Sequence, residues 1–426
     1  MKEYHLQYGK GTIPFIPPLD KEIQLIEPRV HKAPEDELAV VNDALDHPVN
    51  SPSLKELSKE VRSILIITDD NTRPMPSKIT IPAILKSFYK PASEYDITIL
   101  IATGLHRKMT PEEILEQFGR ETVENYKIVN HVATDESLLV CYGKMKSGNE
   151  LWLNRLVLES DLVISEGFIE AHFFAGFSGG RKSILPGVAG ADTIMNNHGP
   201  TNIADVHSFG ANLDGNPIHS ECVEAAKKAK LGFILNVALN KEKKIIGAFA
   251  GDPVDAHLKG CEFVKEAMSV KVHSTDIIIT SNNGYPLDRN LYQVVKGIDV
   301  ASRVVPQGGV IIMAAQCLDG VGHKHFKDLM QSGTSIEELN AKLSVPPCEI
   351  DKWQAQILAR ALLKCTVILI NDTMKKEEVE SMFFTYAANM DEAIRIATKI
   401  KGEDADISVM PEGPVVIPVV WRTHPC

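Results

Sequence analysis

The feature that most constrains this chain is a repeated alternation of short apolar runs, Gly/Asp/Asn-containing loops and helical stretches. The apolar runs are rich in β-branched residues and mostly unbroken, which is typical of strands covered on both faces. They are Ser63–Thr68, Ile97–Ala102, Leu162–Ser165, Phe233–Leu239, Ile277–Thr280, Val310–Met313 and Val367–Ile370. Strands separated by helices predict parallel sheets with crossover connections. We therefore expect an α/β fold with mostly parallel sheets.

Helix signals and chain length suggest how the chain is divided. Thr110-Pro111-Glu112-Glu113 supplies a capping Thr, a first-turn Pro and a reciprocal Glu, so a helix should begin there. Further helices are expected over Ala256–Met268 and Lys352–Leu363. A chain of 426 residues has room for two or three domains.

We place the domain break near Val270–Thr275, where one helix closes and a new strand–loop–helix unit begins. This predicts an N-terminal α/β domain of residues 1–270 and a C-terminal α/β domain of residues 271–426, with the active-site cleft between them and the hinge at the break. The last apolar run, Val415–Val420, contains a Pro and suits an edge strand. That strand is a candidate for return to the N-terminal domain.

Charge and cysteine content exclude several classes of protein. The chain has 45 Lys and Arg against 56 Asp and Glu, a formal net charge of −11. This balance argues against general binding to nucleic acid or to an anionic membrane. No apolar run approaches the roughly 20 residues of a membrane span, and the N-terminus lacks a secretory signal pattern. The seven cysteines show no CxxC spacing, so we expect reduced, mostly buried thiols in a cytoplasmic protein.

Four polar loops directly follow predicted strands. They are residues 69–74 (DDNTRP), 103–107 (TGLHR), 166–190 (EGFIEAHFFAGFSGGRKSILPGVAG) and 281–288 (SNNGYPLD). In open α/β sheets, ligands bind outside the carboxyl ends of the strands. Since these loops carry Arg, His, Lys and Gly between them, we expect them to share one site.

The third loop is Gly-rich around Arg181 and Lys182, a pattern that suits a phosphate. Gly176, Lys182 and Ser183 stand at the spacing of a P-loop, but Arg181 occupies the place of the Gly before the Lys. This departure disfavours an NTPase. A nicotinamide-dependent enzyme is also disfavoured, because no G-x-G-x-x-G turn follows the early strands.

Three of the fourteen histidines have a loop context that suggests function. His106 and His172 lie in post-strand loops with glycines, and His198 follows the Gly-rich loop. His323 and His325 form a weaker metal-ligand pattern. For the other histidines, an exposed or hydrogen-bonded structural role is the default.

The loops, taken in order, resemble the nickel-pincer-nucleotide-dependent lactate racemase family. The matching strings are residues 70–77 (DNTRPMPS), 102–107 (ATGLHR), 164–187 (ISEGFIEAHFFAGFSGGRKSILPG), the Asn197-His198 step, 283–297 (NGYPLDRNLYQVVKG) and 351–356 (DKWQAQ). The resemblance spans most of the chain, and its central string is very specific. It implies an isomerase that racemises a small 2-hydroxy carboxylate, with lactate as the first candidate.

The resemblance also implies the roles of individual residues. Lys182 would carry the covalently attached cofactor, a pyridinium-3-thioamide-5-thiocarboxylic acid mononucleotide with nickel, and His198 would ligate the nickel. His106 and His172 would be the two acid/base residues, with Asp70 orienting His106. The further cofactor contacts implied are Thr72, Arg73, Gly179, Gly180 and Trp353. The substrate contacts implied are Arg73, Tyr285, Gln293 and Lys296, of which Gln293 and Lys296 hold the carboxylate.

The implied chemistry accounts for these residue types. The Cα–H of a 2-hydroxy carboxylate is very weakly acidic, whereas loss of hydride gives a planar 2-keto acid to which hydride can return on either face. Each enantiomer then needs its own base on the hydroxyl, and two imidazoles suit that task. A cation must hold the carboxylate while the ketone turns. The partners implied are the substrate and the cofactor-synthesis enzymes, with no nucleic acid and no membrane.

Two alternatives stay open, as does the oligomeric state. The loop at Asp319–His325 is more basic than expected for a lactate-specific member, and Gly199-Pro200 follows His198. If that loop reaches the substrate, His323 or Lys324 would favour a larger 2-hydroxy acid such as malate, 2-hydroxyglutarate or an aldonate. The other alternative is a nickel- or nucleotide-binding protein without turnover.

Overall fold

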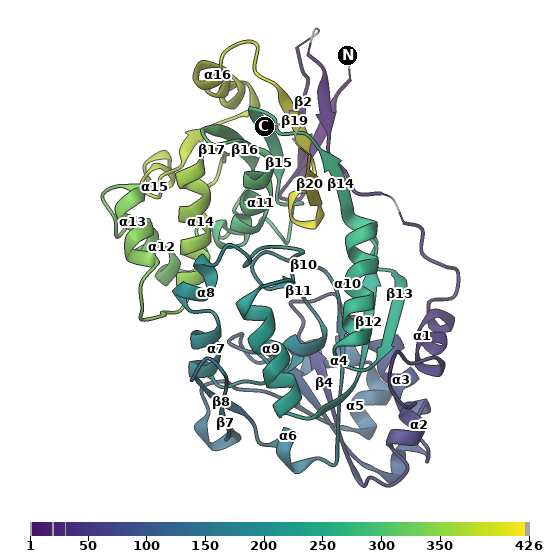
Figure 1. Cartoon of the computed structure of the whole chain (residues 1–426). Coiled ribbons are helices and arrows are strands. Elements are labelled where there is room, and N and C mark those ends of the chain that lie inside the picture. Colours follow the sequence, from purple (N-terminus) through teal and green to yellow (C-terminus); the bar gives the residue numbers. More distant parts are fainter. Residues whose placement is uncertain (1, 19–20, 30, 422–426) are drawn as a thin grey trace. The chain divides into compact units, whose positions relative to one another are not determined.

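The computed structural model describes residues 2–18, 21–29 and 31–421, and divides the chain into two compact units. The N-terminal unit comprises residues 30–197 and 207–267, and the C-terminal unit comprises residues 1–29, 198–206 and 268–426. Both units contain helices and a mostly parallel sheet (Figure 1), so the α/β prediction is confirmed. We predicted one break near residue 270. The units do separate at Met268, and the C-terminal unit also contains two segments from the first half of the chain.

The N-terminal unit is built on a six-stranded sheet in the order β13-β12-β9-β4-β5-β6. Only the β12–β13 pair of this sheet is antiparallel. The strands are β4 (Ser63–Asp69), β5 (Asp96–Ala102), β6 (Lys127–Asn130), β9 (Leu162–Phe168), β12 (Leu231–Leu239) and β13 (Ile245–Gly251). All four strands predicted for this half are therefore present.

Helices of the N-terminal unit pack against this sheet. One core lies between the sheet and α1 to α4. The short η3 segment and α9 contact the other face. The helices are α1 (Glu37–Asp46), α2 (Leu54–Leu57), α3 (Ser77–Lys86), α4 (Pro111–Phe118), α5 (Arg120–Asn125), α6 (Leu156–Glu159), α7 (Ala191–Asn197), α9 (Pro217–Lys228), α10 (Asp255–Met268) and the 3-10 turns η1 (Ala92–Glu94), η2 (Glu136–Leu138) and η3 (Gly180–Ser183). Two antiparallel pairs complete the unit, β7 (Leu139–Lys144) with β8 (Glu150–Asn154) and β10 (Ala171–His172) with β11 (Gly176–Phe177).

The C-terminal unit is built on a second six-stranded sheet, all parallel, in the order β18-β17-β16-β15-β19-β3. Its strands are β3 (Ile23–Leu25), β15 (Ile277–Ser281), β16 (Gly309–Ala314), β17 (Cys365–Ile370), β18 (Thr385–Ala387) and β19 (Ile407–Met410). The three predicted strands are β15, β16 and β17. The edge strand β3 comes from the start of the chain and pairs with β19 near its end, an arrangement that local sequence does not signal.

Helices α11 and α14 contact one another and the sheet, while α16 and the N-terminal hairpin share a core with it. The helices are α8 (Pro200–Ala204), α11 (Leu291–Val304), α12 (Lys324–Met330), α13 (Ile336–Leu343), α14 (Lys352–Lys364), α15 (Lys376–Glu380), α16 (Met390–Lys401) and the 3-10 turn η4 (Gly413–Val415). The hairpin consists of β1 (Tyr4–Tyr8) and β2 (Gly11–Phe15). The last strand, β20 (Ile417–Val420), pairs with β14 (Ser269–Val272) within this unit.

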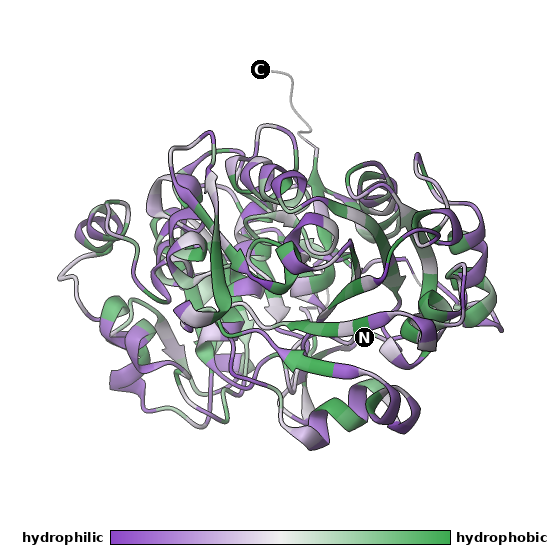
Figure 2. Ribbon diagram, turned by 90° about the horizontal axis from the view of Figure 1, so that it is seen from below, coloured by the Kyte–Doolittle hydropathy of each residue, from purple (hydrophilic) through white to green (hydrophobic). Residues whose placement is uncertain are grey.

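Hydropathy follows this layering. Figure 2 shows the strands largely in the green of apolar residues, while many helices change between green and purple along their turns. The central strands β4, β9 and β16 are buried along nearly their whole length, as unbroken apolar runs predict. Among the described residues, no helix is both long and apolar enough to cross a membrane.

Candidate active site

Asp70 and His106 form a hydrogen-bonded pair at the carboxyl edge of the N-terminal sheet. β4 and β5 are neighbours in register, with Asp69 opposite Ala102, so the loops that follow them start side by side. His106 Nδ1 lies 2.7 Å from Asp70 Oδ2. The Asp70 side chain is 3% exposed and the His106 side chain 52% exposed. A buried carboxylate therefore holds an imidazole whose other face is accessible.

The surroundings of Asp70 keep it ionised and fixed in place. Asp70 Oδ1 accepts hydrogen bonds from the backbone N–H of Thr72 at 3.1 Å and from its hydroxyl at 2.5 Å. Burial acts to raise the pKa of the Asp70 carboxyl, but the hydrogen bond and charge of His106, with Thr72 and Arg73, bring that pKa below its ordinary value. An ionised carboxylate only accepts hydrogen bonds, so Nδ1 of His106 donates and Nε2 presents its lone pair. His106 is thus arranged as a base.

Thr72 and Arg73 lie in the turn that Asp70 caps. The Arg73 backbone N–H donates to Asp70 O at 3.0 Å, which closes the turn. Its guanidinium Nε lies 4.0 Å from Glu170 Oε1, and the Arg73 side chain is 26% exposed. Arg73 is therefore a partly accessible cation beside the Asp70–His106 pair. Its predicted contacts with substrate and cofactor remain predictions.

His172 and Lys182 are brought together by the Gly-rich segment. The β10–β11 hairpin places His172 opposite Gly176, and η3 then carries Lys182 back toward it. Lys182 Nζ lies 3.2 Å from His172 Nε2. Burial lowers the pKa of Lys182 to about 7, and the positive charge of Arg181 acts in the same direction. An amine of this kind is a much better nucleophile at neutral pH than an ordinary lysine.

Arg181 corrects one part of the sequence interpretation. We expected Arg181 and Lys182 to act together as a basic pair toward a phosphate. Instead the Arg181 side chain is 1% exposed, and its guanidinium donates to Ala175 O at 2.7 Å and Gly179 O at 3.3 Å. It also contacts His257 Nε2 at 2.9 Å. Arg181 therefore braces the backbone of the segment that presents Lys182.

Gly179 and Gly180, which the resemblance assigns to the cofactor, have a local structural reason as well. Both adopt positive φ, +74° and +53°. A Cβ atom at Gly179 would lie 2.8 Å from Asn236 Oδ1, and one at Gly180 would lie 2.6 Å from the His257 ring. Asn236 Oδ1 also accepts the Gly180 N–H at 2.8 Å. The turn before Lys182 therefore requires glycine at both positions whether or not a cofactor contacts them.

Two buried carboxyl groups in the N-terminal unit were missed by sequence reasoning. We assigned Glu166 to a loop, which is wrong, because β9 continues through Phe168. The Glu166 carboxyl is 1% exposed and accepts hydrogen bonds from the hydroxyls of Thr68, Ser77 and Thr80. Burial also raises the pKa of Asp69, at the end of β4, to about 7. The signal that was available is the pair of adjacent aspartates at the end of a strand.

In the C-terminal unit, His198 contacts the predicted cofactor residue Trp353. The His198 and Trp353 ring centroids lie 5.7 Å apart with an interplanar angle of 81°. His198 is 6% exposed, and its carbonyl accepts a hydrogen bond from the Cys348 thiol at 3.5 Å. Trp353 lies in the first turn of α14, where Gln354 Nε2 donates to Tyr292 O at 2.5 Å and so links this turn to α11.

The predicted carboxylate anchors Gln293 and Lys296 both lie on α11. Their spacing of three residues places them on one face of the helix. Asn290 caps that helix, because its side chain accepts the Gln293 N–H at 3.1 Å. Asn282 Oδ1 accepts the Gly297 N–H at 3.0 Å and ties α11 to the end of β15. Tyr285, in the loop between these elements, is 46% exposed, with Lys10 Nζ 5.3 Å from its ring centroid.

The basic loop noted in the sequence is neutralised by acidic partners. His323 Nδ1 lies 3.1 Å from both carboxylate oxygens of Asp351, and its ring stacks on Tyr292 at 4.1 Å. Lys324 pairs with Asp328 at 2.5 Å and its side chain is 88% exposed. His325 faces Glu349 at 3.5 Å. Among the described residues there is no group of three or more His, Cys, Asp or Glu side chains that could hold a metal ion.

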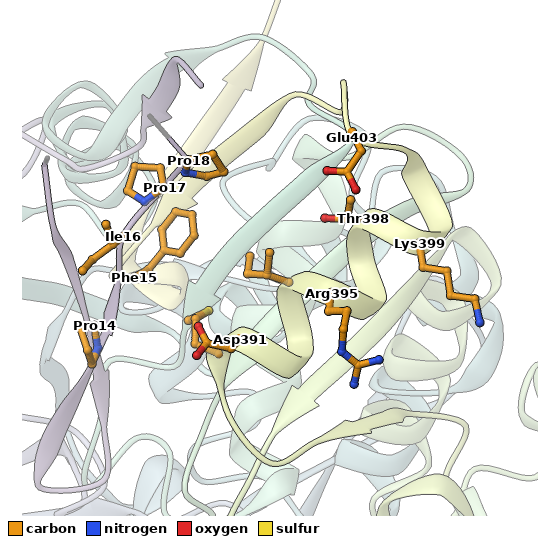
Figure 3. Close-up of a pocket in the computed structure, with 12 residues that line it drawn as sticks. Pro14, Phe15, Ile16, Pro17, Pro18, Asp391, Arg395, Thr398, Lys399 and Glu403 are labelled. Atoms are coloured by element: carbon orange, nitrogen blue, oxygen red, sulfur yellow. The ribbon is translucent and has the colours of Figure 1, made fainter. Parts of the chain in front are cut away.

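A surface groove of the C-terminal unit lies apart from the predicted residues. It is formed by the end of β2 with Pro17 and Pro18, on one side, and by α16, on the other (Figure 3). Its lining contains Phe15, Ile394 and Arg395 but none of the residues that the sequence assigns to substrate or cofactor.

Comparison with known proteins identifies two matching domain models. The lactate racemase N-terminal domain model matches residues 8–208, and the lactate racemase C-terminal domain model matches residues 270–418. The chain is 43% identical over 423 residues to the lactate racemase of Thermoanaerobacterium thermosaccharolyticum, covering 98% of this chain and 99% of that protein. It is 44% identical over 384 residues to the lactate racemase of Lactiplantibacillus plantarum, covering 89% and 91%.

Solved structures show the same likeness. The lactate racemase apoprotein from T. thermosaccharolyticum matches with a TM-score of 0.93 and 42% identity, over 98% of this chain and all of that one. A protein from Thermotoga maritima matches with a TM-score of 0.67 and 16% identity, over 92% of this chain and 100% of that one, which shows a shared fold only.

Proposed function

Because the chain belongs to the lactate racemase family, a family of isomerases that act on hydroxy acids, we propose that it interconverts the enantiomers of lactate. The observation that carries this proposal is the arrangement of the N-terminal unit. It holds one imidazole, His106, oriented by a buried carboxylate, and a second, His172, in contact with Lys182. A protein that only carries a cofactor needs neither an oriented base nor a second one.

The residues present fit the cofactor that the sequence resemblance implies. A nucleotide that brings its own sulfur donors to nickel needs from the protein an amine for attachment and an imidazole as a further ligand. Lys182, whose pKa is lowered to about 7, and the buried His198 are groups of those two kinds. When bound, this group supplies a centre that accepts and returns hydride. No protein thiol is required, and the described cysteines are free.

The chain's own residues perform the acid–base and positioning steps of this proposal. Asp70 accepts the Nδ1–H of His106, so His106 Nε2 takes the hydroxyl proton of one enantiomer as hydride leaves Cα. His172 takes the corresponding proton of the other enantiomer. Gln293 and Lys296, on one face of α11, hold the carboxylate while the planar 2-keto acid turns. The protonated imidazole returns its proton when hydride comes back.

Chiral analysis tests this function directly. We expect protein produced together with cofactor-synthesis enzymes and verified to contain nickel to convert each pure lactate enantiomer into the racemate. The intact mass should show an adduct that Lys182→Ala removes. His106→Ala and His172→Ala should each abolish racemisation while nickel stays bound. Full activity in either histidine variant would contradict the two-base scheme.

A panel of larger acids separates lactate from the second candidate. The second candidate is a larger 2-hydroxy acid whose extra polar group would meet His323, which stacks on Tyr292, the residue before Gln293 on α11. Malate, 2-hydroxyglutarate and an aldonate belong in the panel for that reason. Faster turnover of one of these, reduced selectively by His323→Ala, would replace lactate with that acid. No turnover of any acid by nickel-loaded protein would leave a non-catalytic binding role.

A further inference from the structure

Both ring nitrogens of His172 are engaged in hydrogen bonds. Nε2 lies 3.2 Å from Lys182 Nζ, and Nδ1 accepts a hydrogen bond from the backbone N–H of Ala175 at 3.3 Å. The ring is also held by aromatic neighbours, with centroids 5.1 Å from Phe173 and 4.5 Å from Phe174. The orientation of the imidazole is therefore set by contacts on several sides.

The bond from Ala175 decides which ring nitrogen carries the proton. A backbone N–H only donates, so Nδ1 presents its lone pair, and the single proton of a neutral imidazole lies on Nε2. Nε2–H then faces Lys182 as a donor. A lysine ammonium has three donors and no acceptor, so it cannot pair with this N–H. The contact is satisfied when Lys182 is a neutral amine whose lone pair accepts the bond.

The charges around Lys182 agree with a neutral amine. Burial lowers the pKa of Lys182 to about 7, and Arg181 and Arg73 act in the same direction, while Cys222 and Asp69 oppose them. The Phe174 ring centroid lies 5.7 Å from Nζ and weakly favours the ammonium. That distance is near the outer limit of about 6 Å for a cation–π contact. At neutral pH the uncharged amine is thus readily populated.

We propose that His172 holds Lys182 as a neutral amine ready for acylation, and that acylation turns His172 from a hydrogen-bond donor into a proton acceptor. The identity of the acyl group, a carboxylate or thiocarboxylate of the cofactor in activated form, rests on the proposed function. The state of the Lys182–His172 pair rests on the geometry alone.

The acylation step balances as an ordinary acyl substitution. The Lys182 nitrogen uses its lone pair to form a bond to the acyl carbon. The bond from that carbon to its leaving group breaks, and the leaving group departs with that electron pair. The nitrogen loses one proton to water. No oxidant or reductant takes part.

Acylation reverses the hydrogen bond between the two side chains. The nitrogen lone pair of an amide or thioamide is delocalised, so the nitrogen keeps one N–H donor and no acceptor. Nε2–H of His172 then faces another donor, and the contact becomes a hydrogen bond again when the His172 proton moves to Nδ1 and the Ala175 contact is given up. His172 now presents a lone pair at Nε2, which is the form that a base requires.

Competitive acetylation of cofactor-free protein tests whether His172 holds Lys182 as a neutral amine. Trace acetic anhydride is applied across a range of pH, and peptide mass spectrometry follows Lys182, with the exposed Lys324 as a reference for reagent delivery. We expect half-maximal reactivity of Lys182 near pH 7, about three units below an ordinary lysine at about 10.4. His172→Gln should raise that midpoint by at least a unit, because its amide oxygen accepts from an ammonium. His106→Gln should leave it unchanged.

Nitrogen NMR of histidine-labelled protein tests whether the His172 proton moves on acylation. The measurement uses the wild-type protein, and a His172→Gln sample serves only to assign the His172 signals. We expect the Nε2–H form of His172 before acetylation and the Nδ1–H form after it. A Lys182 midpoint in the ordinary lysine range, or an Nδ1–H form in the free protein, would overturn the inference. Neither readout needs racemase activity. If the Lys182 midpoint and the His172 signals are as expected but no cofactor adduct forms on Lys182, the proposed function fails and this inference stands.

Discussion

At the scale of single residues, the site depends on carboxyl groups whose protonation states differ within a few positions of each other. Asp70 has a lowered pKa and orients His106, whereas burial raises the pKa of the neighbouring Asp69 to about 7. The difference arises because Asp70 receives hydrogen bonds from His106 and Thr72, while burial outweighs the Phe168 N–H and the charge of Arg73 at Asp69. Near neutral pH, Asp70 is therefore ionised, whereas the adjacent Asp69 is partly protonated.

Asp70→Asn should lower the rate of racemisation much more than it lowers the stability of the fold. An Asn amide can donate to Nδ1 of His106, which moves the ring proton to Nε2 and removes the base. Since general acid–base catalysis contributes about 10²–10⁴-fold, we expect kcat for racemisation to fall within that range with the nickel content unchanged. Asn71→Ala is the matched control, because Asn71 bonds Glu113 and neither Asp70 nor His106. Wild-type kcat in Asp70→Asn would contradict the orienting role.

Asp69→Asn should change how stability depends on pH. The native pKa of Asp69, about 7, lies above the ordinary value of about 3.9, so the native state binds its proton more tightly than the unfolded state. The contribution of Asp69 to wild-type stability should therefore fall as pH rises from about 4 to 7. Over this pH range, urea titrations should show the unfolding free energy of Asp69→Asn rising relative to that of wild type by up to about 1.4 kcal/mol per pH unit.

Asp161→Asn is the control of opposite sign. Asp161 accepts the backbone N–H groups of Arg62 and Ser63, which hold its pKa below the ordinary value. Its contribution to stability is present above the unfolded-state pKa and is lost as pH falls through the native pKa. The loss of unfolding free energy caused by Asp161→Asn should thus become smaller as the pH falls. Parallel pH curves for wild type and Asp69→Asn would argue against a raised pKa at Asp69.

At the scale of elements, short signals in the sequence fix where helices begin. Thr110 caps α4 as predicted, since its hydroxyl accepts the Glu113 N–H at 3.3 Å and Glu113 accepts the Thr110 N–H at 2.8 Å. Glu113 also bonds Arg107, which directly follows His106 in the chain. The capping box therefore stabilises the loop that carries a predicted catalytic residue as well as the helix.

Thr110→Ala should destabilise the N-terminal unit by about 1 kcal/mol, the usual cost of losing a side-chain cap. Thr110→Ser keeps a hydroxyl at the cap and should stay close to wild type. Chemical denaturation followed by circular dichroism compares the three proteins. Equal midpoints for wild type and Thr110→Ala would mean that the cap contributes nothing in this fold.

At the scale of the whole molecule, the first segment of the chain folds together with the C-terminal part of the sequence. Residues 1–29 belong to the unit that is otherwise formed by residues 198–206 and 268–426. Strand β3 pairs in parallel with β19, Ile23 opposite Ile407, and the buried Leu6 and Phe15 belong to the core around β15 and β16. The C-terminal sheet is therefore incomplete without the first residues of the chain.

Removal of residues 2–29 should destabilise only the C-terminal unit. Each large apolar side chain withdrawn from a core costs about 2–5 kcal/mol, and the deletion also unpairs the edge of β19. We expect faster hydrogen exchange at Ile407–Met410 and unchanged exchange in β4 and β9 of the other unit. Unchanged protection of β19 would show that β3 adds little to this sheet.

The sequence by itself determined the seven buried strands, the Thr110 cap and the loops that carry His106, His172 and Lys182. These features are local, because apolar runs, turn residues and capping patterns act over a few positions. The predicted roles of Tyr285, Gln293 and Lys296 stay predictions, as does the cleft between the two halves.

Only the tertiary structure decided that Arg181 is a buried brace, that Glu166 lies within β9, and that β3 joins β19. It also decided the proton position on His172, through a bond from Ala175 that depends on the fold of the hairpin. These features join groups whose partners come from other turns and strands, so burial and hydrogen-bond geometry set them. A local pattern gives the type of a residue and its element, whereas the protonation state follows from what surrounds it.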